Sequence, residues 1–135
     1  MYANGYGHGR VLLDLPFEPG RHAIAVSRRG GRVVVGFRGS LDQSTAPTLR
    51  ETVISELAKG PELVVVDLSD VDFWDSCGMS AVLVAYKRCR ANGTALGLAG
   101  LRGSAETSYR ATHLDSVIPT YPDVASAVAH WAAAA

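Results

Sequence analysis

Apolar and polar positions alternate along the chain in blocks that predict strands and helices in turn. The run 63–68 is almost wholly apolar and β-branched, which is typical of a central strand buried on both faces. The apolar side chains of Ala46, Leu49, Val53 and Leu57 repeat at spacings of three and four, as one face of a helix does. Together the blocks predict strands at 23–27, 33–37, 63–68 and 95–101, a short edge strand at 117–121, and helices at 46–57, 76–91, 104–113 and 123–131.

This order of elements predicts an α/β fold with a mixed, mostly parallel sheet of about four to five strands and about four helices. Gly30-Gly31 between the first two strands indicates an N-terminal antiparallel hairpin. Loops are expected at 39–43 and 69–75, and Ser44 or Thr45 is expected to cap the helix at 46–57. Sites in parallel sheets tend to lie at the carboxyl ends of strands, and both loops follow a strand.

The first 20 residues are rich in glycine and aperiodic, and we expect a flexible extension there, followed by one domain at 21–135. Neither a secretory signal nor a membrane span is apparent, which favours a cytoplasmic location. Cys77 and Cys89 fall in one predicted helix about 18 Å apart. That separation is too long for a disulfide, so both should be free thiols.

Lys plus Arg and Asp plus Glu each number 13, so the net charge is zero, and a nucleic-acid partner is not expected. No phosphate-binding glycine loop is present, and none of the four histidines has a metal or triad spacing with Cys77. The sequence therefore predicts no enzyme activity, no catalytic residue, no metal and no cofactor of its own.

The segment 67–79 carries the candidate site. Ser76 begins a predicted helix and follows Asp75, and Asp70 and Asp72 stand just before them. Serine is a frequent helix cap, and from the residues alone capping is the simpler role for Ser76. Asp75 could instead cap that helix or orient the Ser76 hydroxyl. Asp42 is expected to shape a loop beside Ser76, and Gly78 is expected to allow close backbone packing at the first turn of the helix.

Two motifs resemble the STAS family, which joins sulfate transporters with anti-sigma factor antagonists. The family has a buried strand ending in Asp-Leu, followed by Asp-Ser-Ser/Thr-Gly-Leu at the start of a helix, and Asp75-Ser-Cys-Gly-Met79 stands in that place. Its Gly-Glu-Leu-Asp block before the first helix is matched by Gly39-Ser-Leu-Asp42. The resemblance covers roughly residues 21 to 132 and implies the STAS-like mixed sheet.

The resemblance implies a stand-alone bacterial anti-sigma factor antagonist that is phosphorylated on Ser76. The implied kinase is the anti-sigma factor, which brings ATP and Mg²⁺. The unphosphorylated antagonist would bind it and free a sigma factor, and a serine phosphatase would reset the phosphorylated form. The predicted partner-binding residues are Asp42, Ser44, Thr45, Phe73, Trp74, Asp75, Ser76, Cys77, Gly78 and Met79.

The alternative within the family is a subunit of a transport system or a sensory scaffold that binds partners without phosphoryl control. Two positions depart from the family pattern: Cys77 replaces a Ser or Thr, and Ser40 replaces an acidic residue. We expect Cys77 to be a small packed side chain, with a redox role as the other possibility. Of Phe73 and Trp74, one is expected to be buried and the other partly exposed.

Overall fold

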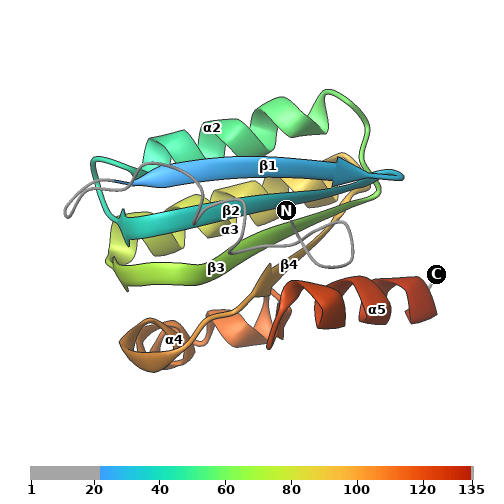
Figure 1. Cartoon of the computed structure of the whole chain (residues 1–135). Coiled ribbons are helices and arrows are strands. Elements are labelled where there is room, and N and C mark those ends of the chain that lie inside the picture. Colours follow the sequence, from blue (N-terminus) through green and yellow to red (C-terminus); the bar gives the residue numbers. More distant parts are fainter. Residues whose placement is uncertain (1–21, 135) are drawn as a thin grey trace.

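The structure is a computed structural model that describes residues 22–134, in which strands and helices alternate as predicted (Figure 1). The extension predicted at 1–20 lies outside the described residues. The elements are β1 (Ala23–Arg29), β2 (Arg32–Leu41), α2 (Ala46–Leu57), β3 (Leu63–Trp74), α3 (Ser76–Ala91), β4 (Ala95–Ala99), α4 (Gly103–Ala111), the 3-10 turn η1 (Leu114–Ser116), β5 (Thr120–Tyr121) and α5 (Val124–Ala134).

The described strands form one five-stranded sheet in the order β1-β2-β3-β4-β5. The β1–β2 pair is antiparallel and the other pairs are parallel, so the predicted mixed sheet is confirmed. Gly30 and Gly31 make the hairpin turn with φ of +54° and +79°. Positive φ at both central residues is the geometry that suits the twist of a hairpin and favours glycine.

The sheet is buried on both faces because side chains of successive residues in a strand point to opposite sides. Val33, Val35 and Phe37 of β2 belong to the larger core, which also takes in the apolar faces of α2 and α3. Val34 and Val65 belong to a second core with α5. Figure 1 shows α2 and α3 on the same side of the sheet, and the continuous apolar runs of β2 and β3 follow from this double covering.

Several predicted boundaries were wrong. The loop predicted at 69–75 is strand as far as Trp74, and the loop predicted at 39–43 is strand as far as Leu41. The two extensions pair with each other, which satisfies main-chain groups despite their polar side chains. The predicted strand at 95–101 ends at Ala99, and the predicted edge strand at 117–121 shrinks to Thr120–Tyr121.

The helices predicted at 46–57 and 76–91 have those bounds, and the boundaries of the two later helices differ by one to three residues. Cys77 and Cys89 are both free, as predicted. Arg28 at the end of β1 donates two hydrogen bonds, of 2.6 and 2.7 Å, to the Glu56 carboxylate of α2. The Glu56 side chain is only 6% exposed, so this bidentate pair anchors the hairpin to the helix.

Candidate functional site

The two motifs meet where β2 and β3 end. Leu41 and Trp74 are paired in the last register position of these parallel strands, and the Asp75 N–H donates to the Leu41 carbonyl oxygen at 3.3 Å. The loop that leaves β2 and the helix that follows β3 therefore start side by side. This arrangement brings residues 42–45 next to the start of α3.

The Asp42 carboxylate organises the first loop. Its Oδ1 accepts from the Ser44 hydroxyl at 2.7 Å and from the Ser44 N–H at 2.9 Å. These hydrogen bonds, that from the hydroxyl above all, hold the pKa of Asp42 below its usual value. The predicted loop-shaping role of Asp42 is confirmed.

Thr45 directly precedes α2, as predicted, but its hydroxyl does not cap the helix. The Thr45 Oγ1 accepts from the Asp42 N–H at 2.9 Å and donates to the Ser40 carbonyl at 2.7 Å. The predicted capping by Ser44 or Thr45 is therefore wrong for this helix, because both hydroxyls are used within the loop. The result is a turn braced by its own side chains.

Asp75, not Ser76, caps α3. Its carboxylate accepts from the N–H groups of Cys77 at 2.8 Å and Gly78 at 3.2 Å. The capping role for Ser76 is wrong, and the capping role for Asp75 is confirmed. Ser76 is the first residue of the helix and is exposed. Its hydroxyl therefore has no capping role and is accessible to another protein.

Gly78 lets the start of α3 approach the sheet. A Cβ at this position would overlap the Leu41 carbonyl oxygen and lie 3.1 Å from the Leu41 Cγ and 3.2 Å from the Trp74 Cβ. The predicted close packing at Gly78 is confirmed. The adjoining Met79 packs against the larger core, and Cys77 is half-buried, in keeping with a small packed side chain.

Phe73 and Trp74 follow a bulge near the end of β3 and differ in exposure. Gly39 pairs with Val71 and Ser40 pairs with Phe73, so Asp72 is an extra residue on β3. Both Asp72 and Phe73 are consequently exposed, Phe73 by 54%. Trp74 is 3% exposed, and its Nε1–H donates to the Ala105 carbonyl at 3.1 Å. The expectation of one buried and one exposed aromatic is confirmed.

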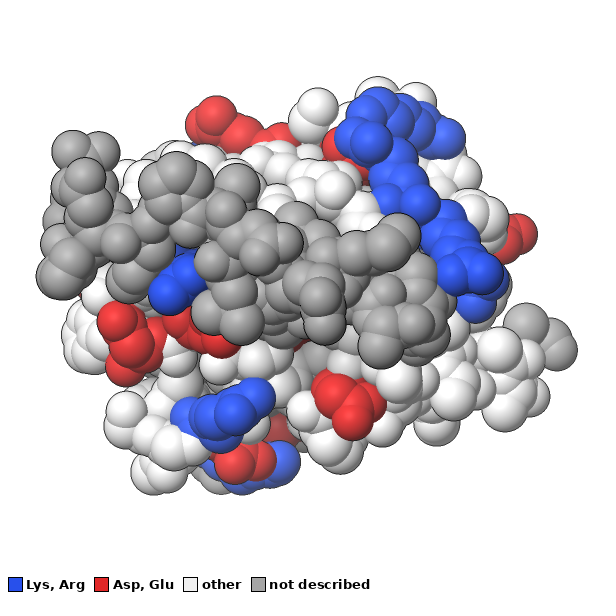
Figure 2. Space-filling model, viewed as in Figure 1, with Lys and Arg blue, Asp and Glu red and all other residues white. Residues whose placement is uncertain are grey.

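Negative charge collects at this end of the molecule. Asp42 and Asp75 are half-buried and Asp72 is exposed, and Asp72 accepts a 3.1 Å hydrogen bond from Ser40, the residue that departs from the family's acidic pattern. In Figure 2, acidic side chains lie where β2 and β3 end, basic side chains also lie near that end, and the longest run of Lys and Arg side chains lies toward the opposite end. The three carboxylates thus give this surface local negative charge in a chain whose net charge is zero.

A cavity of about 260 Å³ opens beside Ser76, between the first turns of α2 and α3. Gln43, Arg50 and Ser80 line it together with Ser76 and small or apolar side chains. The sequence analysis missed these three residues. Their spacing held a signal, because Ser80 lies four residues after Ser76 and Arg50 lies four after buried Ala46, which places each pair on one helix face.

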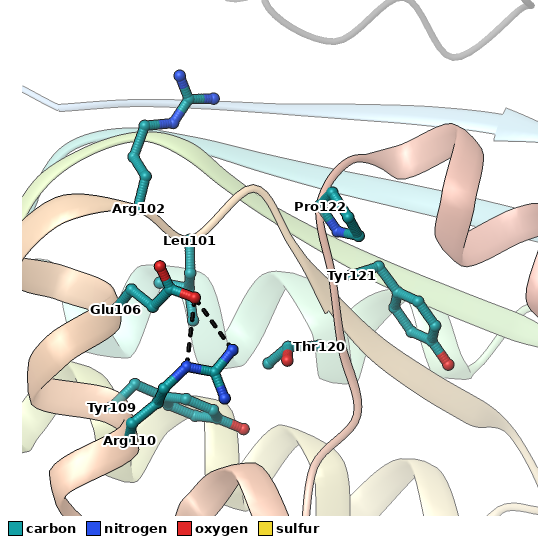
Figure 3. A pocket seen from close by; sticks show the side chains of 8 residues that line it. All are labelled: Leu101, Arg102, Glu106, Tyr109, Arg110, Thr120, Tyr121 and Pro122. Carbon is teal, nitrogen blue, oxygen red and sulfur yellow. Dashed lines mark hydrogen bonds and ion pairs between the residues drawn. The ribbon is translucent and has the colours of Figure 1, made fainter.

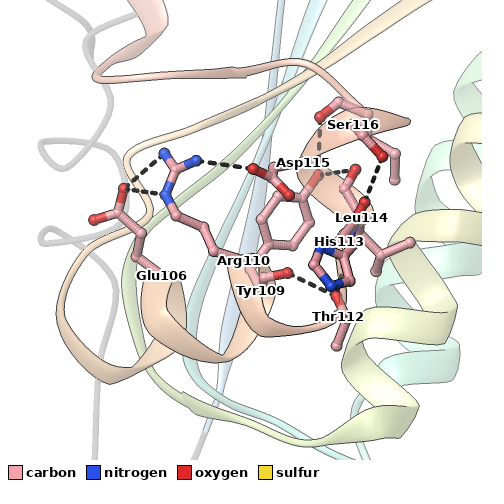
Figure 4. A network of polar contacts seen from close by, with 9 residues as sticks. Glu106, Tyr109, Arg110, Thr112, His113, Leu114, Asp115 and Ser116 are labelled. Carbon is pink, nitrogen blue, oxygen red and sulfur yellow. Dashed lines mark hydrogen bonds and ion pairs between the residues drawn. The ribbon is translucent and has the colours of Figure 1, made fainter.

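A larger cavity of about 470 Å³ lies apart from this site, at the ends of β4 and β5 (Figure 3). On the side of this cavity formed by α4, Arg110 forms ion pairs with Glu106 at 3.0 Å and with Asp115 at 3.2 Å (Figure 4). The Tyr109 hydroxyl donates to the carbonyls of Leu114 and Ile118. These contacts tie α4 to η1 and to Ile118 before β5, and they give Glu106, Tyr109 and Arg110 of the cavity lining a structural role.

In the part of the chain that the structure describes, no group of three or more His, Cys, Asp or Glu side chains is placed to hold a metal ion. Within the same residues, none of the helices combines the length and the hydropathy that crossing a bilayer requires.

The sheet order, the two motifs and the exposed serine at the start of α3 define a STAS domain. The family model described as STAS domain matches residues 23–127, and the chain belongs to this family.

The chain is similar to anti-sigma-F factor antagonist RsfA of Mycobacterium tuberculosis, with 25% identity over 105 residues, 76% of this chain and 82% of that protein. It is also similar to the crystal structure of an anti-sigma factor antagonist from Mycobacterium paratuberculosis, with 29% identity, a TM-score of 0.75, and coverage of 84% of this chain and 96% of the other.

The fold is shared more widely. A sulfate transporter family protein from Wolinella succinogenes aligns with a TM-score of 0.68 at 17% identity, over 76% of this chain and 85% of that one. The fold alone therefore does not separate a regulator from a transport subunit, and the site must make that distinction.

Proposed function

We propose that this chain is an anti-sigma factor antagonist that is controlled by phosphorylation of Ser76. The observation that carries the proposal is the exposed Ser76 at the first position of α3, with the capping role taken by Asp75. Its hydroxyl has no structural task that phosphorylation would disrupt. The similarity to two mycobacterial proteins that are called anti-sigma factor antagonists supports the same function.

The unphosphorylated protein binds an anti-sigma factor through the surface around Ser76, and the sigma factor is released. Phe73 is the apolar anchor of this surface, since it is 54% exposed and lies three residues before the serine in the sequence, and aromatic residues are frequent hot spots of binding. The surface includes the loop 42–45 and the start of α3. Trp74 and Gly78 support it from beneath, because both are buried.

Phosphorylation ends the interaction by adding charge. A phosphate carries about −1.5 to −2 charges at neutral pH, and it would join the carboxylates of Asp72 and Asp75 on one surface. In a closed interface the dianion must be stripped of water and is repelled by these carboxylates. A loss of about 3 kcal/mol of binding free energy weakens affinity by more than about a hundredfold.

The phosphoryl chemistry belongs to the partner kinase. The γ-phosphoryl group passes from Mg²⁺-bound ATP to the Ser76 Oγ, the hydroxyl proton leaves, and ADP is the product. Asp75 is assigned the capping role and not that of a general base, because its Oδ1 accepts two N–H groups and phosphoryl transfer depends mainly on positioning and metal charge. A serine phosphatase hydrolyses the phosphoserine and resets the protein, and the cycle takes place in the cytoplasm.

A subunit of a transport system or a sensory scaffold is the second candidate, since the fold is shared with a sulfate transporter family protein. Such a protein would bind its partner through the same surface without phosphoryl control. The exposed, uncommitted hydroxyl of Ser76 favours the regulator, because a scaffold has no need of it.

The test is to incubate the protein with ATP-binding anti-sigma factors and radiolabelled ATP and to map the phosphate by mass spectrometry. We expect label on Ser76, and none in Ser76→Ala. Ser76→Ala should bind the kinase whether or not ATP is present, and Ser76→Glu should bind it at least about tenfold more weakly than the wild type.

Ser55→Ala is the matched control, because Ser55 is an exposed helical serine in the last turns of α2 and does not line the cavity beside Ser76. It should be labelled like the wild type. Label that persists at another hydroxyl in Ser76→Ala would reject Ser76 as the site. Binding of a transport or sensory partner that is indifferent to both Ser76 variants would favour the second candidate.

A further inference from the structure

Arg50 is a cation at the phosphorylation surface that none of the family motifs includes. It lies in the second turn of α2, is half-buried, and lines the 260 Å³ cavity on which Ser76 also borders. Within residues 22–134 no ion pair or side-chain hydrogen bond engages its guanidinium. Arginine is a planar donor that matches phosphate and carboxylate oxygens two at a time.

Asp42 and Asp75, which adjoin the lining residues Gln43 and Ser76 in the sequence, already accept hydrogen bonds. Asp42 accepts from the N–H and the hydroxyl of Ser44, and Asp75 accepts from the first amides of α3. The cavity therefore has one formal charge in its lining, that of Arg50, among neutral side chains. An anion that enters this open cavity would meet the positive charge of a half-buried side chain, with which a close ion pair is stronger than one between fully exposed groups.

We infer that Arg50 is the residue that holds the phosphate of phosphorylated Ser76, and that the free Arg50 guanidinium receives a carboxylate of the anti-sigma factor when Ser76 is unphosphorylated. This inference rests on the proposed function. Phosphorylation then acts in part by competition within this protein: the phosphate occupies the arginine that the partner's carboxylate needs.

Competition and simple repulsion make opposite predictions for Arg50→Gln. Under repulsion alone, removal of a positive charge makes the phosphorylated form bind even more weakly, so the penalty of phosphorylation grows. Under competition, Arg50→Gln weakens binding of the unphosphorylated form to the anti-sigma factor, because the contact with the partner's carboxylate is already lost. Phosphorylation then lowers the affinity by a smaller factor than in the wild type. The ratio of the two dissociation constants therefore separates the two mechanisms.

The first measurement needs no kinase. Protein with phosphoserine placed at position 76 by genetic encoding is titrated and followed by ³¹P NMR. The pair with Arg50 favours the dianion, so the second pKa of the phosphate should lie about half a unit lower in the wild type than in Arg50→Gln. Arg50→Lys, which keeps the charge but not the planar fork, should give an intermediate value.

Arg88→Gln is the matched control. It removes the same charge from an exposed position on α3, and twelve residues of helix place it about 18 Å from Ser76. That distance exceeds the Debye length of about 8 Å at physiological salt, so the phosphate pKa should stay at the wild-type value. Equal phosphate pKa values in the wild type and Arg50→Gln would overturn the inference.

The second measurement is the affinity of each form for the anti-sigma factor by calorimetry. Arg50→Gln should weaken the unphosphorylated form about tenfold and should reduce the ratio between phosphorylated and unphosphorylated dissociation constants. A larger ratio in Arg50→Gln than in the wild type would overturn the competition. A kinase that labels a residue other than Ser76 would refute the proposed function instead, while the NMR titration would still report on Arg50.

Discussion

Replacing Gly78 by alanine tests how tightly the start of α3 is held against the sheet. The added Cβ would overlap the Leu41 carbonyl oxygen and press on the Trp74 Cβ at 3.2 Å. Overpacking of this kind costs about 1–3 kcal/mol, and alanine regains about 1 kcal/mol over glycine in a helix. The Leu41 oxygen also accepts a hydrogen bond from the Asp75 N–H, so moving this oxygen away from the added Cβ would weaken that hydrogen bond. The steric clash therefore outweighs the gain in helix propensity.

We expect Gly78→Ala to lower the free energy of unfolding by about 1 kcal/mol after the gain in helix propensity is subtracted, which corresponds to a fall in Tm of about 4 °C for a domain of this size. Urea and thermal unfolding followed by circular dichroism measure it. Ser80→Ala, at an exposed site of the same helix, should stay within about 0.5 kcal/mol of the wild type. A Gly78→Ala protein as stable as the wild type would show that the contact with Leu41 does not constrain the helix.

Two further predictions concern other parts of the fold. The Arg28 hydrogen bonds hold the pKa of Glu56 below its usual value, so Glu56 stabilises the fold above the unfolded pKa of about 4.3 and loses this contribution as the pH falls through the lower folded pKa. Glu56→Gln should therefore have a lower free energy of unfolding than the wild type at pH 7, measured by urea unfolding, and this difference should shrink below about pH 4.3. Glu51→Gln, at an exposed position, is the control. A difference that stays the same from pH 7 to pH 3 would contradict the coupling. Burial raises the pKa of the Cys89 thiol to about 12, so a disulfide reagent should modify only Cys77 in the folded protein, and rapid modification of both thiols without unfolding would refute the buried placement of Cys89.

The order of elements and the candidate serine could be predicted from the sequence because their signals are local. Apolar periodicity marks α2 and α3, and the run of β-branched residues marks the first half of β3. The second half of β3 escaped prediction because residues 69–74 are mixed in polarity. They become strand only through pairing with β2, a contact between residues more than thirty positions apart.

The roles of individual site residues were harder to assign. Asp75 and Ser76 are both good helix caps, and the choice of Asp75 depends on the backbone turn after Trp74. Arg50 was not recognised because a single arginine on a helix is usually solvated. Its position matters only because the start of α3 lies across the same cavity, and that neighbourhood is set by the packing of two helices.

The buried Trp74 can serve as an intrinsic fluorescence probe of the region near Ser76. Its indole ring is 3% exposed, donates a hydrogen bond to Ala105 and stacks on Tyr109 at 5.7 Å between ring centroids. The other tryptophan, Trp131, lies on α5, so Trp131→Phe leaves Trp74 as the single tryptophan of the chain, two residues from Ser76. Its emission then tracks the sheet end beneath the docking surface, and an unlabelled partner can be titrated against it in ordinary buffer.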